Sequence, residues 1–199
     1  MSERRRMMMG VKLPYDAKIT YLRGTGTQWI DTGIIPKTNT KAQFKFMNSV
    51  VTGDCILGYS DANDKKSWRF FNYSSRAYLD LPGANNTRNR IYGGTIKAGV
   101  IYNLEIGNIY VKNLSTGNDI VRGTASPAFV GLNTIRLNND GKGITTKNYF
   151  YYVKIFEGSV LVRDMIPVRV GTTGYMYDKV TKQLFGNQGT GDFILGPDK

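Results

Sequence analysis

Apolar and polar residues alternate with a period of two along many short stretches of this chain. The clearest stretch is 41–47, where Ala42, Phe44 and Phe46 share one side and lysines and a glutamine occupy the other. Successive side chains of a β-strand point to opposite faces, so this pattern predicts a strand with one buried face. The stretch 148–156 carries apolar residues on both sides, which predicts a central strand or one covered on its second face.

Similar runs, bounded by glycine, asparagine or aspartate, predict a series of further short strands. They lie at 19–22, 28–32, 56–59, 68–73, 76–81, 100–106, 109–112, 120–122, 129–132, 134–137, 160–163, 165–170, 175–177, 183–185 and 193–195. No stretch of helical length has a period near 3.6 residues. Many short strands at this spacing are typical of a sandwich or barrel, so we expect an all-β fold.

The composition agrees with a single β-domain that has its own core. A length of 199 residues suits one all-β domain. Hydrophobic residues make up 41% of the chain and aromatic residues 12%, which is enough apolar material for a core. The 23 glycines suit turns, and the 13 tyrosines suit half-buried strand faces. We therefore expect a β-sandwich over residues 17–199.

Residues 1–16 differ from the rest of the chain and show no strand or helix period. Guanidinium groups pair with carboxylates, and flexible thioethers fill irregular apolar grooves. The segment is therefore a candidate extended arm that docks on a partner, with a frayed terminus as the alternative. Its candidate anchoring residues are Arg4, Arg5, Arg6, Met7, Met8, Met9, Leu13 and Tyr15.

Two parts of the sandwich region resemble a known family. The first is YLRGTGTQWIDTG at 21–33. The second comprises YVKI at 152–155, VRDMIP at 162–167, YD at 177–178, LFGN at 184–187 and GTG at 189–191. They resemble the opening and closing segments of LamG-type, concanavalin A-like domains from gut Bacteroidetes and their phages. The resemblance implies a jelly-roll β-sandwich, a fold that hosts lectins, glycanases and structural modules.

The arm resembles the short N-terminal pieces of virion-attached proteins in such phages, for example head-fibre, decoration or tail proteins. This resemblance implies a structural protein of the virion, made in the cytoplasm of the bacterial host. The arm would dock on capsid or tail proteins, and the sandwich would be displayed as a homo-oligomer or in many copies, with its outer face touching host glycans. A bacterial carbohydrate-binding module is the alternative function, and a glycoside hydrolase is the third.

The residues that common catalytic mechanisms need are scarce. The chain has no histidine, so the commonest general base and metal ligand are both missing. Glycan hydrolysis needs two carboxylates placed across one bond. The three glutamates, Glu3, Glu105 and Glu157, lie in the arm, on a polar strand face and in a turn. We therefore expect no enzyme, although a pair of acids from distant strands stays open.

Four aromatic residues are candidates for stacking against sugar rings: Trp29, Trp68, Tyr73 and Tyr78. We expect no resident cofactor or metal. Two loops hold side-chain oxygens that suit Ca²⁺, although the same residue types form ordinary turns, the interpretation that we favour. These loop residues are Asp61, Asn63 and Asp64 in one loop and Asn138, Asn139 and Asp140 in the other.

The charge and hydropathy of the chain limit its partners. The formal net charge is +12, but outside the arginine triplet the basic residues are scattered singly, as on solvated sheet faces. No nucleic-acid-binding module is recognisable, so we expect no nucleic-acid partner. No apolar run approaches the length of a membrane span, and we expect no Sec signal peptide because the arginines precede no apolar segment.

Overall fold

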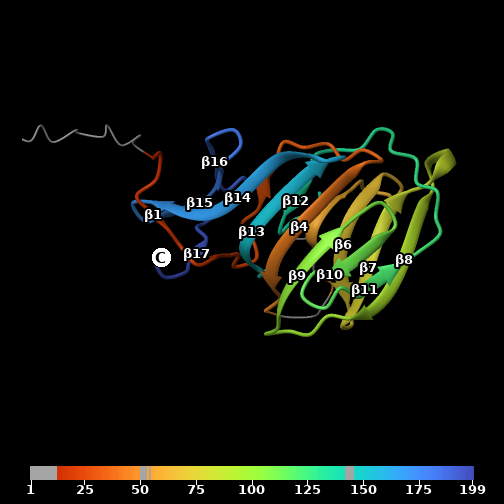
Figure 1. Ribbon diagram of the computed structural model, residues 1–199, viewed down its shortest axis with the longest axis horizontal. Helices are drawn as coiled ribbons and strands as arrows, with labels where there is room; N and C mark the ends of the chain where they lie inside the picture. Colours follow the sequence, from red (N-terminus) through yellow and green to blue (C-terminus); the bar gives the residue numbers. More distant parts are fainter. Residues whose placement is uncertain (1–12, 50–52, 54, 142–145) are drawn as a thin grey trace, which may run out of the picture.

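The computed structural model describes residues 13–49, 53, 55–141 and 146–199. Within these residues, two antiparallel sheets pack against each other (Figure 1). The expected all-β sandwich is confirmed. In the part of the chain that the structure describes, no helix is both long enough and apolar enough to cross a bilayer. The predicted anchoring residues 4–9 lie outside the described residues.

The larger sheet contains eleven strands in the described part of the chain. Its main path runs through β11 (Asp119–Arg122), β10 (Tyr110–Asn113), β9 (Ile101–Ile106), β4 (Thr40–Met47), β13 (Tyr149–Glu157), β14 (Val160–Val170), β15 (Thr173–Asp178) and β16 (Gln183–Phe185). In addition, β1 (Ala17–Lys18) pairs with β14, and β2 (Leu22–Arg23) pairs with both β13 and β17 (Ile194–Leu195).

The smaller sheet contains six strands among the described residues. Its order is β3 (Ile30–Asp31), β12 (Arg136–Leu137), β5 (Cys55–Ser60), β6 (Ser67–Tyr73), β7 (Arg76–Pro82) and β8 (Arg88–Thr95). A short 3₁₀ turn, η1 (Ala84–Asn86), lies between β7 and β8. Because β6, β7 and β8 follow one another in the chain and in the sheet, their side chains form one continuous face.

The core lies between the two sheets. Ala42, Phe44 and Phe46 on β4 have exposed fractions of 0%, which confirms the predicted buried face of that strand. Across the interface, the ring centroid of Phe70 on β6 lies 6.1 Å from that of Phe44 and 6.3 Å from that of Phe46. Aromatic pairs at such distances add to the stabilisation that apolar burial alone provides between the two sheets.

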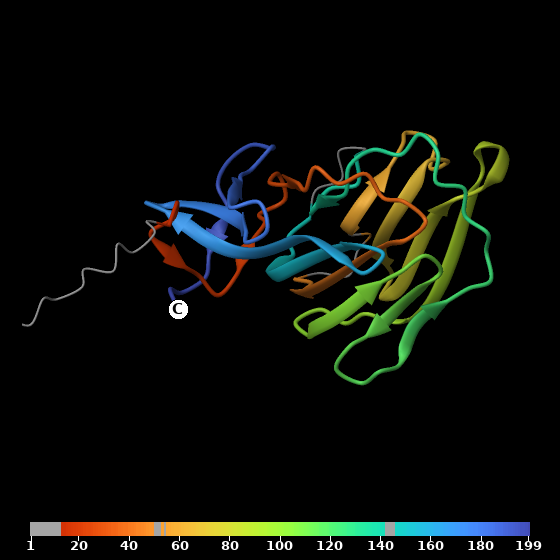
Figure 2. The ribbon, with the colours of Figure 1, turned by 45° about the horizontal axis from the view of Figure 1, so that its top comes forward.

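A smaller lobe extends from one end of the sandwich (Figures 1 and 2). We call it the terminal lobe; it comprises β1, β15, β16, β17 and the part of β14 after Met165. β14 is a single strand where the sequence pattern predicts two, and it changes partner from β13 to β15 at Met165. Met165 and Met176 are fully buried and belong to the same apolar cluster as the sandwich core. The core therefore continues into the lobe.

Both ends of the described chain are held in the terminal lobe. The ring centroid of Tyr15 lies 4.9 Å from that of Tyr177, and the Asp16 amide donates to the Arg169 carbonyl at 2.9 Å. At the other end, the Lys199 amide donates to the Lys18 carbonyl at 2.9 Å. Tyr15 is thus packed on its own chain, while Leu13 is 47% exposed.

The strand pattern was also wrong at two further places. β8 was not predicted, because only Ile91 of its inward residues is a large apolar side chain and Gly93 and Gly94 interrupt the run. Residues 129–132 were predicted as a strand but form none. Gly131 there has a φ of +66°, outside the extended region, and Val130 is 75% exposed.

Candidate functional site

The outer face of the smaller sheet carries charged and aromatic side chains, whereas its inner face is apolar. On β6, Trp68 and Phe70 point into the core, so Arg69 and Phe71 point away from it. The registers align one residue from each strand into a row across the whole sheet. The row is Asp31, Arg136, Gly58, Arg69, Asp80 and Arg90. We call this side of β3, β12 and β5–β8 the arginine–aromatic face.

Arg69 lies at the centre of a buried charge cluster. Its Nη1 donates to Asp140 Oδ2 at 2.9 Å, and its Nε and Nη2 donate to Asp80 Oδ2 at 3.1 and 3.0 Å. Nη2 also donates to Asp64 Oδ1 at 2.9 Å. The side chains of Asp80 and Asp140 have exposed fractions of 0%. Burying these carboxylates would be very costly without the guanidinium, because charge is poorly solvated away from water.

Two further arginines complete this cluster. Arg90 donates to both carboxylate oxygens of Asp80, at 2.7 and 2.9 Å, and Arg88 lies 2.7 Å from Asp64. The hydrogen bonds to Asp80 raise the pKa of Arg90 above its usual range, and this outweighs the opposing effect of burial. The charge cluster, defined as Arg69, Arg88, Arg90, Asp64, Asp80 and Asp140, therefore pairs three cations with three anions.

Three aromatic rings form a second row beside the cluster. Phe71, Tyr78 and Tyr92 are cross-strand neighbours on β6, β7 and β8. The rings of Phe71 and Tyr78 are stacked at 5.0 Å with an interplanar angle of 16°, and Tyr92 lies 6.2 Å beyond. The Arg69 and Arg90 guanidinium groups lie 4.6 and 5.0 Å from the Phe71 centroid. Cation–π attraction thus joins the aromatic row to the charge cluster.

Trp29 lies at the other end of the face, just before β3. The Arg136 guanidinium is 4.4 Å from its ring centroid and 5.3 Å from that of Tyr59. The backbone of Trp29 also bonds to the loop after β16, since its amide donates to Asn187 Oδ1 at 3.1 Å. Its carbonyl accepts from the Gln188 amide at 2.8 Å. Trp29 therefore joins the smaller sheet to the terminal lobe.

The four predicted sugar-stacking residues have different positions. Tyr73 and Tyr78 lie on the arginine–aromatic face, where Tyr73 is 59% exposed and Tyr78 is half-buried. Trp29 is half-buried at its far end. Trp68 is corrected: its exposed fraction is 0%, so its ring belongs to the core and offers no surface to a sugar. Its parity on β6 already places it opposite Arg69.

Sequence reasoning missed Arg76, Tyr92 and Arg136. The available signal was the alternation along β6, where Arg69, Phe71 and Tyr73 occupy one side and Trp68, Phe70 and Asn72 the other. The same alternation places Arg76, Tyr78 and Asp80 on one side of β7. That pattern predicts a second, polar face on the same strands.

The two loops considered for Ca²⁺ meet at Arg69. Asp64 from one loop and Asp140 from the other both accept hydrogen bonds from this guanidinium. Asp61 Oδ1 accepts from the amides of Lys65 and Lys66, which is the arrangement of a turn. Among the described residues, no group of three or more acidic or cysteine side chains could hold a metal ion.

Glu105, on the outer face of the larger sheet, is a hydrogen-bonded carboxylate. It accepts from Gln43 Nε2 at 2.8 Å and from the Tyr110 hydroxyl at 2.6 Å. Burial alone would raise the pKa of Glu105, but these hydrogen bonds and two nearby lysines hold it below its usual range. Burial and the hydrogen bond to Glu105 raise the pKa of Tyr110. An ionised carboxylate of lowered pKa does not suit the role of a general acid at neutral pH.

A scan against models of known protein families gives no match, and a search of curated proteins also gives none. Among solved structures, the chain is similar to the enzymatically active domain of tailspike protein 2 from bacteriophage CBA120, with a TM-score of 0.45 and 12% sequence identity. The match covers 77% of this chain and 30% of the tailspike chain, so this chain spans less than a third of that structure's length.

Proposed function

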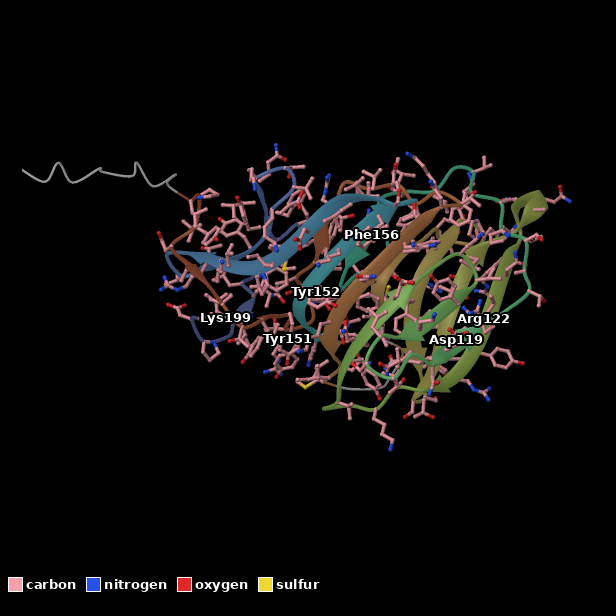
Figure 3. All side chains as sticks on the ribbon, viewed as in Figure 1. Asp119, Arg122, Tyr151, Tyr152, Phe156 and Lys199 are labelled. Atoms are coloured by element: carbon pink, nitrogen blue, oxygen red, sulfur yellow. The ribbon has the colours of Figure 1, made fainter. Side chains whose placement is uncertain are left out.

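We propose that the protein is a non-enzymatic attachment protein that docks through its N-terminal end and binds a glycan on its arginine–aromatic face. The observation that supports this most is the separation of the terminal lobe from the end of the arginine–aromatic face formed by β6, β7 and β8. The terminal lobe holds both ends of the described chain, and β6, β7 and β8 lie at the opposite end of the sandwich (Figure 1). Figure 3 labels Lys199 in the lobe and Asp119 and Arg122 far from it. A docking partner and a glycan would thus use different surfaces.

The assembly that we propose is a phage virion, and the proposed fold is a concanavalin A-like jelly roll. The arginine and methionine triplets of the arm supply groups for an acidic and an apolar partner surface. The chain stretches that resemble jelly-roll domains run through β2 and β3 and through β13–β16, where the lobe joins the sandwich. Display as a homo-oligomer or in many copies would add the avidity that weak glycan contacts need.

A non-enzymatic role agrees with the ion pairs that the aspartates of this face form. Asp64, Asp80 and Asp140 on the face are bound to arginines. Glycoside hydrolysis needs one carboxyl group that stays protonated near neutral pH and a second one opposite it. Release of reducing sugars from plant or host glycans by the purified chain would favour the hydrolase instead.

Deletion of residues 2–10 is expected to abolish incorporation into particles while the sandwich stays folded. The described fold begins after this segment, and its first inter-strand bonds are made by Asp16 and β1. Light scattering of the full-length and shortened chains, alone and with candidate capsid and tail proteins, measures assembly. Circular dichroism of the shortened chain is the control for folding. Normal incorporation of the shortened chain would contradict the anchoring role.

A carbohydrate-binding module of a bacterium is the second candidate, favoured by the half-buried indole of Trp29 beside Arg136. It predicts saturable binding to a polysaccharide in which the arm has no part. Trp29→Ala is then expected to weaken that binding about tenfold or more, because the loss of an aromatic platform removes most of its stacking energy. Titration calorimetry measures the effect, and an unchanged affinity would exclude Trp29 from the site.

A further inference from the structure

The arginine–aromatic face ends in a two-residue turn between β6 and β7. Ser74 and Ser75 have φ values of +48° and +65°, the left-handed conformation of type I′ hairpin turns. The turn makes Tyr73 and Arg76 the last cross-strand pair of the hairpin. The Arg76 guanidinium lies 4.8 Å from the ring centroid of Tyr92 on β8. We call Tyr73, Arg76 and Tyr92 the tip of the face.

Arg76 differs from the three arginines of the charge cluster in the acidic side chains around it. The charge cluster pairs Arg69, Arg88 and Arg90 with three aspartates. In contrast, no carboxylate in the described residues lies within ion-pair distance of Arg76, which is exposed to solvent. A guanidinium over a ring keeps the N–H groups on its edge free to donate. Considering the residues that the structure describes, the tip therefore carries one cation that no carboxylate neutralises, with N–H donors available.

The two tyrosines of the tip are the other exposed feature of this site. Tyr73 and Tyr92 each have an exposed fraction of 59%, which is high for rings of this size. The Tyr92 ring contacts the Arg76 guanidinium. The neighbouring ring of Tyr78, in the aromatic row, restrains the position of Tyr92. Tyr73 is the cross-strand partner of Arg76, so its exposed ring and the guanidinium belong to the same face. An apolar ring face beside a bidentate donor matches a sugar ring that bears a carboxylate.

We infer that the tip binds an acidic saccharide, in which the sugar ring contacts Tyr73 and the carboxylate accepts hydrogen bonds from Arg76. This inference rests on the proposed function and adds the class of glycan. Hexuronic and sialic acids share the required chemistry, a pyranose ring with a carboxylate. The positive net charge of the chain would also favour the approach of an acidic polymer, whereas Arg76 would provide the specific contact.

The experiment measures the affinity of the full-length protein for an oligogalacturonate and a sialylated oligosaccharide, each beside its methyl ester. The ester keeps the sugar ring and removes the charge. We expect at least one acid to bind about tenfold more tightly than its ester, and Arg76→Gln to remove this preference. Lys154→Gln is the matched control, since it also removes one positive charge, from β13 on the opposite sheet. It should change the affinity less than about twofold.

Three outcomes would overturn the inference. Equal affinity for acid and ester would exclude a contact between the protein and the carboxylate. The proposed function would still stand, with a neutral glycan as the ligand. Equal losses in Arg76→Gln and Lys154→Gln would show general attraction between opposite charges, without a site. No binding to any saccharide would reject glycan binding by the face altogether. Retention of the acid preference by Lys154→Gln and its loss in Arg76→Gln and Tyr73→Ala would support the tip.

Discussion

Arg69→Ala is expected to lower the free energy of unfolding by about 3–5 kcal/mol, the usual cost of removing one partner from a buried ion pair. The substitution leaves Asp140, whose side chain is 0% exposed, without the guanidinium that lies 2.9 Å from it. Within the described part of the chain, Asp80 then keeps one arginine partner, Arg90, which is more exposed. A domain of this kind has roughly 5–15 kcal/mol of total stability, so the loss is a large fraction of it. Urea unfolding followed by tryptophan fluorescence measures the change.

Arg122→Ala is the matched control for this prediction. Arg122 also forms an arginine–aspartate pair, at 2.6 Å from Asp119, but its side chain is 55% exposed. Surface pairs contribute less than about 1 kcal/mol, because water already solvates both groups. Asp64→Asn, at a cluster carboxylate that is 28% exposed, should give an intermediate loss. Equal effects of Arg69→Ala and Arg122→Ala would show that burial does not set the strength of the cluster.

The period-two pattern predicted most of the longer sandwich strands, because it reports which side of a strand is buried. It succeeded at β4, where three apolar residues alternate with polar ones, and at β13 and β14. It failed at β8, whose single large inward residue, Ile91, gives no detectable period. The pattern predicted two strands, 160–163 and 165–170, and gave no sign that they form one strand that runs into the terminal lobe. Partner exchange along a strand depends on tertiary pairing, which local hydropathy does not encode.

The candidate site was harder to predict than the strands. The sequence reasoning selected aromatic residues by type, and it chose Trp68 together with Tyr73 although they lie on opposite faces of β6. The charge cluster joins Arg69 to Asp80 within a hairpin but to Asp140 across 71 positions. The hairpin contact follows from register, whereas the second contact requires the order of strands in the sheet. That order places β12 beside β5 and was not predictable from local pattern.

Trp68→Ala is expected to lower the free energy of unfolding by about 3–5 kcal/mol, as for other large aromatic side chains removed from a core. The ring is fully buried between the sheets, in the same cluster as Phe44, Phe46 and Phe70. The cost includes both the lost transfer of apolar surface and the cavity that the indole leaves. Urea unfolding measures this loss. The loss comes from packing in the core. Sugar stacking by Trp68, as predicted from the sequence, would have required an exposed ring.

Trp68→Phe separates packing from ligand contact. Among the described residues, Trp68 Nε1 is buried with no hydrogen-bond partner, and a buried donor of this kind costs about 1–3 kcal/mol. Phenylalanine removes that donor and keeps part of the packing, so Trp68→Phe should destabilise less than Trp68→Ala. It should also leave glycan binding unchanged, because the ring lies on the far side of β6 from Arg69 and Phe71. A folded Trp68→Phe variant that loses glycan binding would show that the ligand enters between the sheets, and the arginine–aromatic face would then not be the binding surface.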